Sequence, residues 1–234
     1  DFIRRRFSVK KFKRALSAWQ NGLAGRAWNA LYLENHDHAR VISRYGSERY
    51  RVESGKALAA AYMLLQGTPF IYQGQEIGMT NLRLPSADMY PDVQTRGMVK
   101  AASRWLSPRR VLRLTQDAAR DSSRTPMQWT SGKNAGFTEG EPWFFVNENA
   151  RTVNVEAEDA DEDSLLNFYR ALIAFRKGEP IIRYGSYTEH IPQSANFYVY
   201  SREFEERRLL VIASLVDKET YFTCPEGFNL VDGE

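Results

Sequence analysis

The densest group of ionisable side chains in this sequence follows a short apolar run. Residues 30–33 are apolar without alternation, which predicts a short strand buried on both faces. The next seven positions hold two of the chain's three histidines together with other polar groups: Glu34, Asn35, His36, Asp37, His38 and Arg40. Parallel α/β folds keep their chemistry at the carboxyl ends of strands, so this cluster is the first candidate site.

The residue types in this cluster favour carboxylate chemistry over the common alternatives. Carboxylates in different environments can do acid–base work, and a histidine can donate to a substrate hydroxyl, so Glu34, His36 and Asp37 are candidates. A metal site needs three or four converging ligands, and His36 and His38 have no third ligand nearby. The chain has no nucleophile-elbow motif and no glycine-rich phosphate loop. On residue chemistry alone, a catalytic carboxylate site and a structural polar cluster both stay open.

A helix is expected before this cluster. Ser8 predicts the N-terminal cap of a helix over residues 9–21. Phe12, Leu16 and Trp19 recur at spacings of four and three, which predicts one apolar face. The expected strand at 30–33 then follows.

The cluster is followed by a second unit of the same kind. A helix is expected over residues 51–66, ended by Gly67, and a second buried strand over 69–72. That strand again runs into a polar, glycine-rich loop at 73–78. Because strands, polar loops and helices alternate, the fold class is predicted to be α/β with a parallel sheet or barrel. Both polar loops would then share one C-terminal rim.

The remaining segments predict a long functional loop and a change of architecture. Residues 93–119 favour one or two helices interrupted at Pro108, and 121–138 is long and polar for a loop inside a domain. A helix is expected over 159–177. Beyond Pro180, short strand-like runs predict an antiparallel β unit: 184–191, 196–203, 208–215 and 220–224. We therefore expect two domains, 1–179 and 180–234, the second of them incomplete.

Composition excludes several classes of partner. The net charge of +3 comes from 32 basic and 29 acidic residues, which makes no case for nucleic acid or a membrane surface. No apolar run reaches the length of a membrane-spanning helix. The single cysteine, Cys224, rules out an intrachain disulfide and is compatible with a reducing, cytoplasmic location.

Several segments carry a family resemblance. Asn35-His-Asp-His-Ala-Arg40 resembles the Asn-His-Asp-Gln-x-Arg signature of the α-amylase family of glycoside hydrolases. The segment 66–79 resembles the next strand motif of its α-glucosidase branch. Arg124-Thr-Pro-Met-Gln-Trp129, Asn134-Ala-Gly-Phe137 and Val153-Asn-Val155 are similar to later segments of oligo-1,6-glucosidases, dextran glucosidases, maltases and trehalose-6-phosphate hydrolases. The resemblance runs from about residue 8 to 225.

This resemblance implies a fold and a set of roles. The family fold is a (β/α)₈ barrel followed by an antiparallel β domain, so 1–179 would be the C-terminal portion of the barrel with strands seven and eight. Asp37 would be the third catalytic carboxylate, which stabilises the oxocarbenium-like transition state, and His36 would bind the non-reducing glucose. The neighbouring sugar would be met by Arg40, Glu76 and Arg124, for which a surface ion pair is the alternative. His38 stands where glutamine is usual and receives no role.

The resemblance also implies what this chain lacks. The family's nucleophile and general acid lie on strands four and five, upstream of anything present, so the chain alone is expected to be inactive. No cofactor is expected in this segment, since the usual calcium loop belongs to the missing N-terminal part. The expected partners are that missing half of the barrel and an α-linked gluco-oligosaccharide.

The reaction itself has alternatives. The main reading is a retaining α-glucosidase acting on α-1,6 or α-1,4 bonds. A trehalose-6-phosphate hydrolase and a glucosyl-transferring or isomerising relative are enzymatic alternatives. A non-catalytic carbohydrate-binding fragment and a member like the transporter heavy chains are the non-enzymatic ones. Intact His36 and Asp37 favour an enzyme, because the heavy chains tend to lose the catalytic carboxylates.

Overall fold

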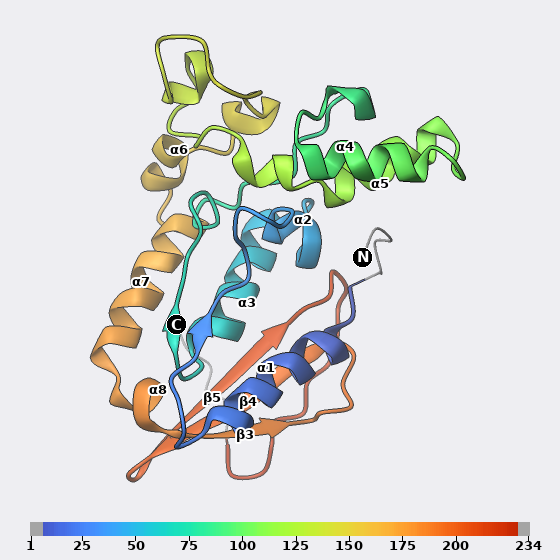
Figure 1. Ribbon diagram of the computed structural model, residues 1–234. Helices are drawn as coiled ribbons and strands as arrows, with labels where there is room; N and C mark the ends of the chain where they lie inside the picture. Colours follow the sequence, from blue (N-terminus) through green and yellow to red (C-terminus); the bar gives the residue numbers. More distant parts are fainter. Residues whose placement is uncertain (1–6, 229–234) are drawn as a thin grey trace. The chain divides into compact units, whose positions relative to one another are not determined.

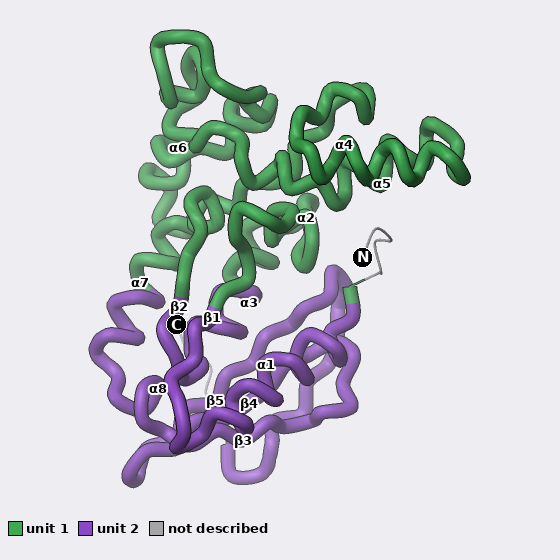
Figure 2. Tube along the Cα trace, in the orientation of Figure 1, with its two compact units in different colours: residues 1–7, 32–56, 70–171 green, residues 8–31, 57–69, 172–234 purple. Residues whose placement is uncertain are grey.

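The computed structural model describes residues 7–228 (Figure 1). These divide into two compact units (Figure 2): the first contains residues 32–56 and 70–171, and the second contains 8–31, 57–69 and the described residues from 172 onward. Each unit is thus assembled from segments that are far apart in the sequence. The domain boundary expected near Pro180 stays a prediction, and the outer ends of both expected domains lie outside the described residues.

The second unit contains a short parallel pair of strands. β1 (Ala30–Leu31) pairs in parallel with β2 (Thr68–Pro69), so both strands are shorter than predicted but run in the predicted relation. Gly67 enters β2 with φ of +141°, and a Cβ there would lie 2.6 Å from the carbonyl oxygen of Asn29. Only glycine allows this close approach of the two backbones.

The second unit also contains an antiparallel sheet in the order β3-β4-β5. Its strands are β3 (Ser186–His190), β4 (Phe197–Phe204) and β5 (Arg207–Ser214), which confirms three of the four predicted runs. Residues 220–224 do not form a strand, so that prediction was wrong. A short helix, α8 (Pro180–Tyr184), precedes β3.

Helix α1 (Val9–Leu23) lies along β3 and β4 of this sheet (Figure 1). Ser8 caps it by accepting a hydrogen bond from the amide of Lys11 at 3.4 Å, as predicted. The predicted apolar face is confirmed only in part: Phe12 and Leu16 are half-buried, but Trp19 is 58% exposed. The buried positions include the polar residues Lys13, Ser17 and Gln20.

Specific partners explain why this buried face is polar. The Lys13 ammonium donates to the carbonyl oxygens of Ile191 and Phe197 at 2.8 and 3.2 Å. Ser17 donates to the Glu189 carboxylate at 2.6 Å. A buried polar group with a matching partner avoids the desolvation cost that otherwise drives apolar residues inward.

The first unit is mainly helical. Its helices include two that separate just before Pro108, which confirms the predicted interruption. The helix expected over 159–177 begins later, at Leu165. The α-helices wholly or partly in this unit are α2 (Val41–Tyr45), α3 (Arg51–Met63), α4 (Val93–Ala102), α5 (Pro108–Ala118), α6 (Val155–Ala160) and α7 (Leu165–Gly178). Short 3₁₀ turns lie at Ala87–Met89, Arg120–Arg124, Lys133–Gly136 and Glu148–Arg151.

One apolar cluster of the first unit holds together the segments that carry the candidate site. It consists of Leu82, Leu84, Tyr90, Ala119 and Phe144. The Tyr90 hydroxyl is fixed by donating to the Leu82 carbonyl at 2.8 Å and accepting from the Leu84 amide at 3.1 Å. Because Tyr90 and Ala119 come just before the polar starts of α4 and the 120–124 turn, their packing brings those two starts together.

No helix among residues 7–228 combines the length and the apolar character needed to cross a membrane.

Candidate active site

The segment between β1 and α2 presents His36 and Asp37 to solvent. The Asn35 side-chain oxygen accepts a hydrogen bond from the Asp37 amide at 2.9 Å, which forms a local turn of the kind that Asn favours. The side chains of His36 and Asp37 are 65% and 48% exposed, and the His36 Nε2 lies 3.3 Å from the Asp37 Oδ2. The sequence-predicted pair therefore lies together and is open to solvent.

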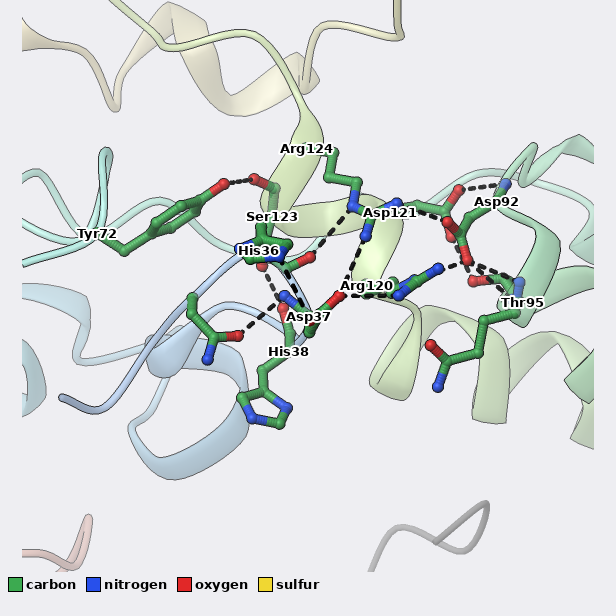
Figure 3. Close-up of polar contacts among 12 residues, drawn as sticks. His36, Asp37, His38, Tyr72, Asp92, Thr95, Arg120, Asp121, Ser123 and Arg124 are labelled. Carbon is green, nitrogen blue, oxygen red and sulfur yellow. Dashed lines mark hydrogen bonds and ion pairs between the residues drawn. The ribbon is translucent and has the colours of Figure 1, made fainter.

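Two arginines hold the other oxygen of the Asp37 carboxylate (Figure 3). Arg120 Nη1 donates to Asp37 Oδ1 at 2.8 Å, and Arg124 Nη2 donates to the same oxygen at 3.2 Å. Both arginines come from the 3₁₀ turn Arg120–Arg124. Arg124 also donates from Nε to the His36 carbonyl at 3.1 Å. This turn is thus fastened to both members of the predicted pair.

A second carboxylate, Asp92, binds the same two guanidinium groups. Asp92 Oδ1 accepts from Arg120 Nε at 2.9 Å, and Asp92 Oδ2 accepts from Arg124 Nη1 at 2.6 Å. Two cations therefore lie between two anions (Figure 3). Charge-assisted hydrogen bonds of this kind are stronger than neutral ones, and the planar guanidinium fixes their directions.

Asp92 is also the N-terminal cap of α4. Its Oδ1 accepts from the amides of Gln94 and Thr95 at 2.9 and 3.2 Å. Burial acts to raise the pKa of Asp92, but the hydrogen bonds from Arg120, Thr95 and Gln94 and the Arg120 charge outweigh it, so the pKa lies below its usual value. The hydrogen bond to Asp92 in turn raises the pKa of Arg120. Asp92 is therefore an anion at neutral pH.

Asp121 supports this arrangement from inside the unit. Its Oδ1 accepts from the Asp92 amide at 3.0 Å, and its Oδ2 accepts from the Thr95 hydroxyl. Ser123, from the same turn, donates to the His38 carbonyl. The turn is thereby tied to the start of α4 on one side and to the 36–38 segment on the other.

Arg40 lies in the interior of the first unit, whereas the family resemblance implied a position at the rim near a sugar. Its side chain is fully buried, and its Nη1 donates to Glu34 Oε1 and to the Gln73 carbonyl, both at 2.7 Å. Its Nε donates to the Ser122 carbonyl at 3.1 Å. Arg40 therefore links three chain segments beneath the site. Its full burial does not fit the predicted contact with a sugar.

Glu76 lies apart from the Asp37 network. Among residues 7–228 no ion pair or hydrogen bond connects it to Asp37, and its Oε2 is buried without a hydrogen-bond partner. Burial raises the pKa of Glu76, against hydrogen bonds from its own amide and that of Gly74 and the charge of Arg40. Its predicted role in binding a sugar stays a prediction.

The two neighbouring histidines lack further ligands for a metal ion. No group of three or more His, Cys, Asp or Glu side chains within residues 7–228 is arranged to hold one. Burial, followed by the charge of Arg44, lowers the pKa of His38, while Asp37 opposes this.

Sequence reasoning missed Asp92 and Arg120. A weak local signal for Asp92 was present, because an acidic residue directly before an expected helix is a typical cap. For Arg120 the only signal was its spacing of four from Arg124. Arg120 contacts Asp37 across 83 residues of sequence, and Asp92 is linked to Asp37 through Arg120 and Arg124, so both links depend on the tertiary fold.

Comparisons with known proteins show which family this chain resembles. The family model for the alpha amylase catalytic domain matches residues 3–185. The oligo-1,6-glucosidase of Parageobacillus thermoglucosidasius is 42% identical over 225 residues, which are 95% of this chain and 40% of that protein. The chain therefore spans about 40% of the length of the curated relatives it matches.

Solved structures extend the same comparison. A trehalose-6-phosphate hydrolase of Bacillus licheniformis superposes with a TM-score of 0.93 at 38% identity, over 97% of this chain and 42% of that one. An isomaltulose synthase of Klebsiella sp. LX3 superposes with a TM-score of 0.87 at 35% identity, over 92% of this chain and 39% of that one. Because the family model covers most of the residues and the relatives agree with it, this chain belongs to the alpha-amylase family.

Proposed function

We propose that the complete protein containing this chain is a retaining α-glucosidase that hydrolyses terminal α-1,6 or α-1,4 bonds of short oligosaccharides. The observation that carries this proposal is the exposed Asp37 carboxylate, held by two arginines beside His36. The match to oligo-1,6-glucosidases supports it.

The proposed role of Asp37 is electrostatic. Glycoside hydrolysis develops positive charge on the sugar ring, and a fixed carboxylate stabilises that charge more than it stabilises the neutral substrate. Arg120 and Arg124 occupy only Oδ1 of Asp37, so Oδ2 is left on the His36 side to meet sugar hydroxyls. His36 is proposed to donate to the non-reducing glucose, while Arg124 and Glu76 are assigned to the neighbouring sugar. The fully buried Arg40 is assigned to holding the chain segments of the site together.

The rest of the apparatus is proposed to lie outside this chain. A retaining glycosidase needs a nucleophile and a general acid about 5 Å apart. By family resemblance both belong to the missing N-terminal half, which would also bind any calcium ion. In this proposal β1 and β2 are strands seven and eight of the (β/α)₈ barrel, and the segment from Pro180 onward is the β domain. The single Cys224 supports a cytoplasmic location.

Two enzymatic alternatives are favoured by particular matches. The superposition on a trehalose-6-phosphate hydrolase supports a phosphorylated substrate. The superposition on an isomaltulose synthase supports transfer or isomerisation of a glucosyl unit. A non-catalytic member, like a transporter heavy chain, is disfavoured because Asp37 is present and is held by Arg120 and Arg124.

Product analysis of the complete protein tests the function. Isomaltose, maltose, sucrose and trehalose 6-phosphate are each supplied, and α-glucosidase activity predicts glucose release from isomaltose or maltose. Asp37→Asn should lower kcat by about 100-fold or more, because it removes a charge that acts in the transition state. Asp163→Asn is the matched control, since Asp163 is exposed and distant in the sequence. Unchanged activity in Asp37→Asn would contradict the assignment.

A further inference from the structure

Both carboxylate oxygens of Asp92 accept hydrogen bonds from other groups of the protein. Oδ1 accepts from Arg120 and from the Gln94 and Thr95 amides, and Oδ2 accepts from Arg124. Its side chain is only 8% exposed, whereas that of Asp37 is 48% exposed. Asp92 is therefore placed to act on other side chains and not on a substrate.

Each guanidinium is aimed by its contact with Asp92. The guanidinium is planar, so fixing one N–H sets the directions of the others. Anchoring Arg120 through Nε points its Nη1 at Asp37, and anchoring Arg124 through Nη1 points its Nη2 at the same oxygen. Asp92 is itself held by the α4 start and by Asp121.

Asp92 also sets the charge balance around Asp37. With Asp92 present, two guanidinium charges are shared by two carboxylates. Without it, both cations would act on Asp37 alone and would reduce the negative potential that Asp37 offers to a developing cation.

We infer that Asp92 is a positioning residue, which orients Arg120 and Arg124 on Asp37 and keeps the charge of Asp37 available to the transition state. This inference rests on the proposed glucosidase function. It assigns no contact between Asp92 and the sugar.

The test uses the complete protein with Asp92→Asn. Asparagine is as good a helix cap as aspartate, so α4 keeps its start, but the amide has no charge and cannot accept from Arg124 through its nitrogen. We expect kcat on isomaltose to fall by about 100-fold while KM changes much less, because the loss acts on transition-state charge. Asp92→Glu should recover part of kcat.

Two further variants separate positioning from a loss of stability. Ser8→Ala removes a helix cap from α1, which has no tie to Asp37, and should leave kcat unchanged while lowering the thermal midpoint. In an Asp37→Asn background, Asp92→Asn should have little additional effect, because it acts through Asp37. Full additivity of the two losses, or an equal kcat loss in Ser8→Ala, would overturn the inference.

An independent chemical readout separates this inference from the proposed function. Phenylglyoxal modifies accessible guanidinium groups, and peptide mapping should show faster modification of Arg120 and Arg124 in Asp92→Asn. Arg207, whose side chain is 62% exposed and pairs with Glu179, is the internal reference. An unchanged rate of modification of Arg120 and Arg124 would refute the positioning role of Asp92. A faster rate in a protein that releases no glucose from any α-glucoside leaves the positioning role intact and refutes the proposed function.

Discussion

At the scale of single residues, the two oxygens of Asp37 have different neighbours. Oδ1 accepts from two guanidinium donors, and Oδ2 has His36 as its ion-pair partner among residues 7–228. Asp92, with its lowered pKa, keeps those donors in place at neutral pH. Its stabilising contribution is present above the ordinary value of 3.8 and is lost as the pH falls through its lower value in the folded state.

Glu76 has the opposite pH dependence. Burial raises its pKa above the ordinary 4.5, so the folded state binds the proton more tightly than the unfolded state does. Raising the pH from 4.5 toward neutrality should therefore destabilise the wild type relative to Glu76→Gln, which has no proton to lose. Thermal midpoints of the complete protein across that pH range measure the difference, with the exposed Glu162→Gln as control. A difference that does not change with pH would contradict this account.

At the scale of elements, the buried face of α1 consists of Val9 and three polar side chains with hydrogen-bond partners, Lys13, Ser17 and Gln20. Lys13 is the clearest case: burial lowers its pKa, yet two carbonyls accept from it and Glu189 lies 3.8 Å from its ammonium. Gln20 donates to the Gln66 carbonyl at 2.9 Å. Helix α1 is therefore joined to its surroundings in the second unit by directional contacts.

Removing the Lys13 side chain should weaken the attachment of α1 to the second unit. Lys13→Ala leaves the Ile191 and Phe197 carbonyls and the Glu189 carboxylate without this donor, and should lower the free energy of unfolding by about 1–3 kcal/mol. Lys10→Ala, on the exposed side of the same helix, should change it by less than about 0.5 kcal/mol. Urea unfolding of the complete protein measures both. Equal effects would show that the buried ammonium contributes nothing specific.

At the scale of the whole molecule, the two compact units are each made of discontinuous segments. The site belongs entirely to the first unit, since His36, Asp37, Asp92, Arg120 and Arg124 all lie within it. The chain covers about 40% of its curated relatives. In the proposed function, the nucleophile and the general acid lie outside these residues.

The chain by itself should therefore have no glucosidase activity. We expect no release of p-nitrophenol from p-nitrophenyl α-glucoside above that of an Asp37→Asn chain, because Asp37 stabilises charge but forms no bond to the sugar. The complete protein is the positive control. Turnover by the isolated chain that depends on Asp37 would show that a nucleophile is present among these residues.

Local sequence was enough for much of the fold. Ser8 and Pro108 act through a cap and through ring geometry, so they marked helix starts without knowledge of distant contacts. The helix expected to run to Gly67 ends at Met63 instead, and Gly67 is needed for the close approach to Asn29. The polar cluster at the end of β1 likewise identified His36 and Asp37. Strand lengths and the run at 220–224 were misjudged, because pairing in a sheet depends on neighbours that the local pattern does not specify.

The tertiary structure decided which charges meet. Asp92 and Arg120 reach the Asp37 network only because Tyr90 and Ala119 pack in one apolar cluster and bring their segments together. The polar face of α1 has the same origin, since Lys13 is buried only where distant carbonyls accept from it. Local propensity determined where several helices begin, and long-range pairing determined the strand lengths and the surroundings of the candidate catalytic carboxylate.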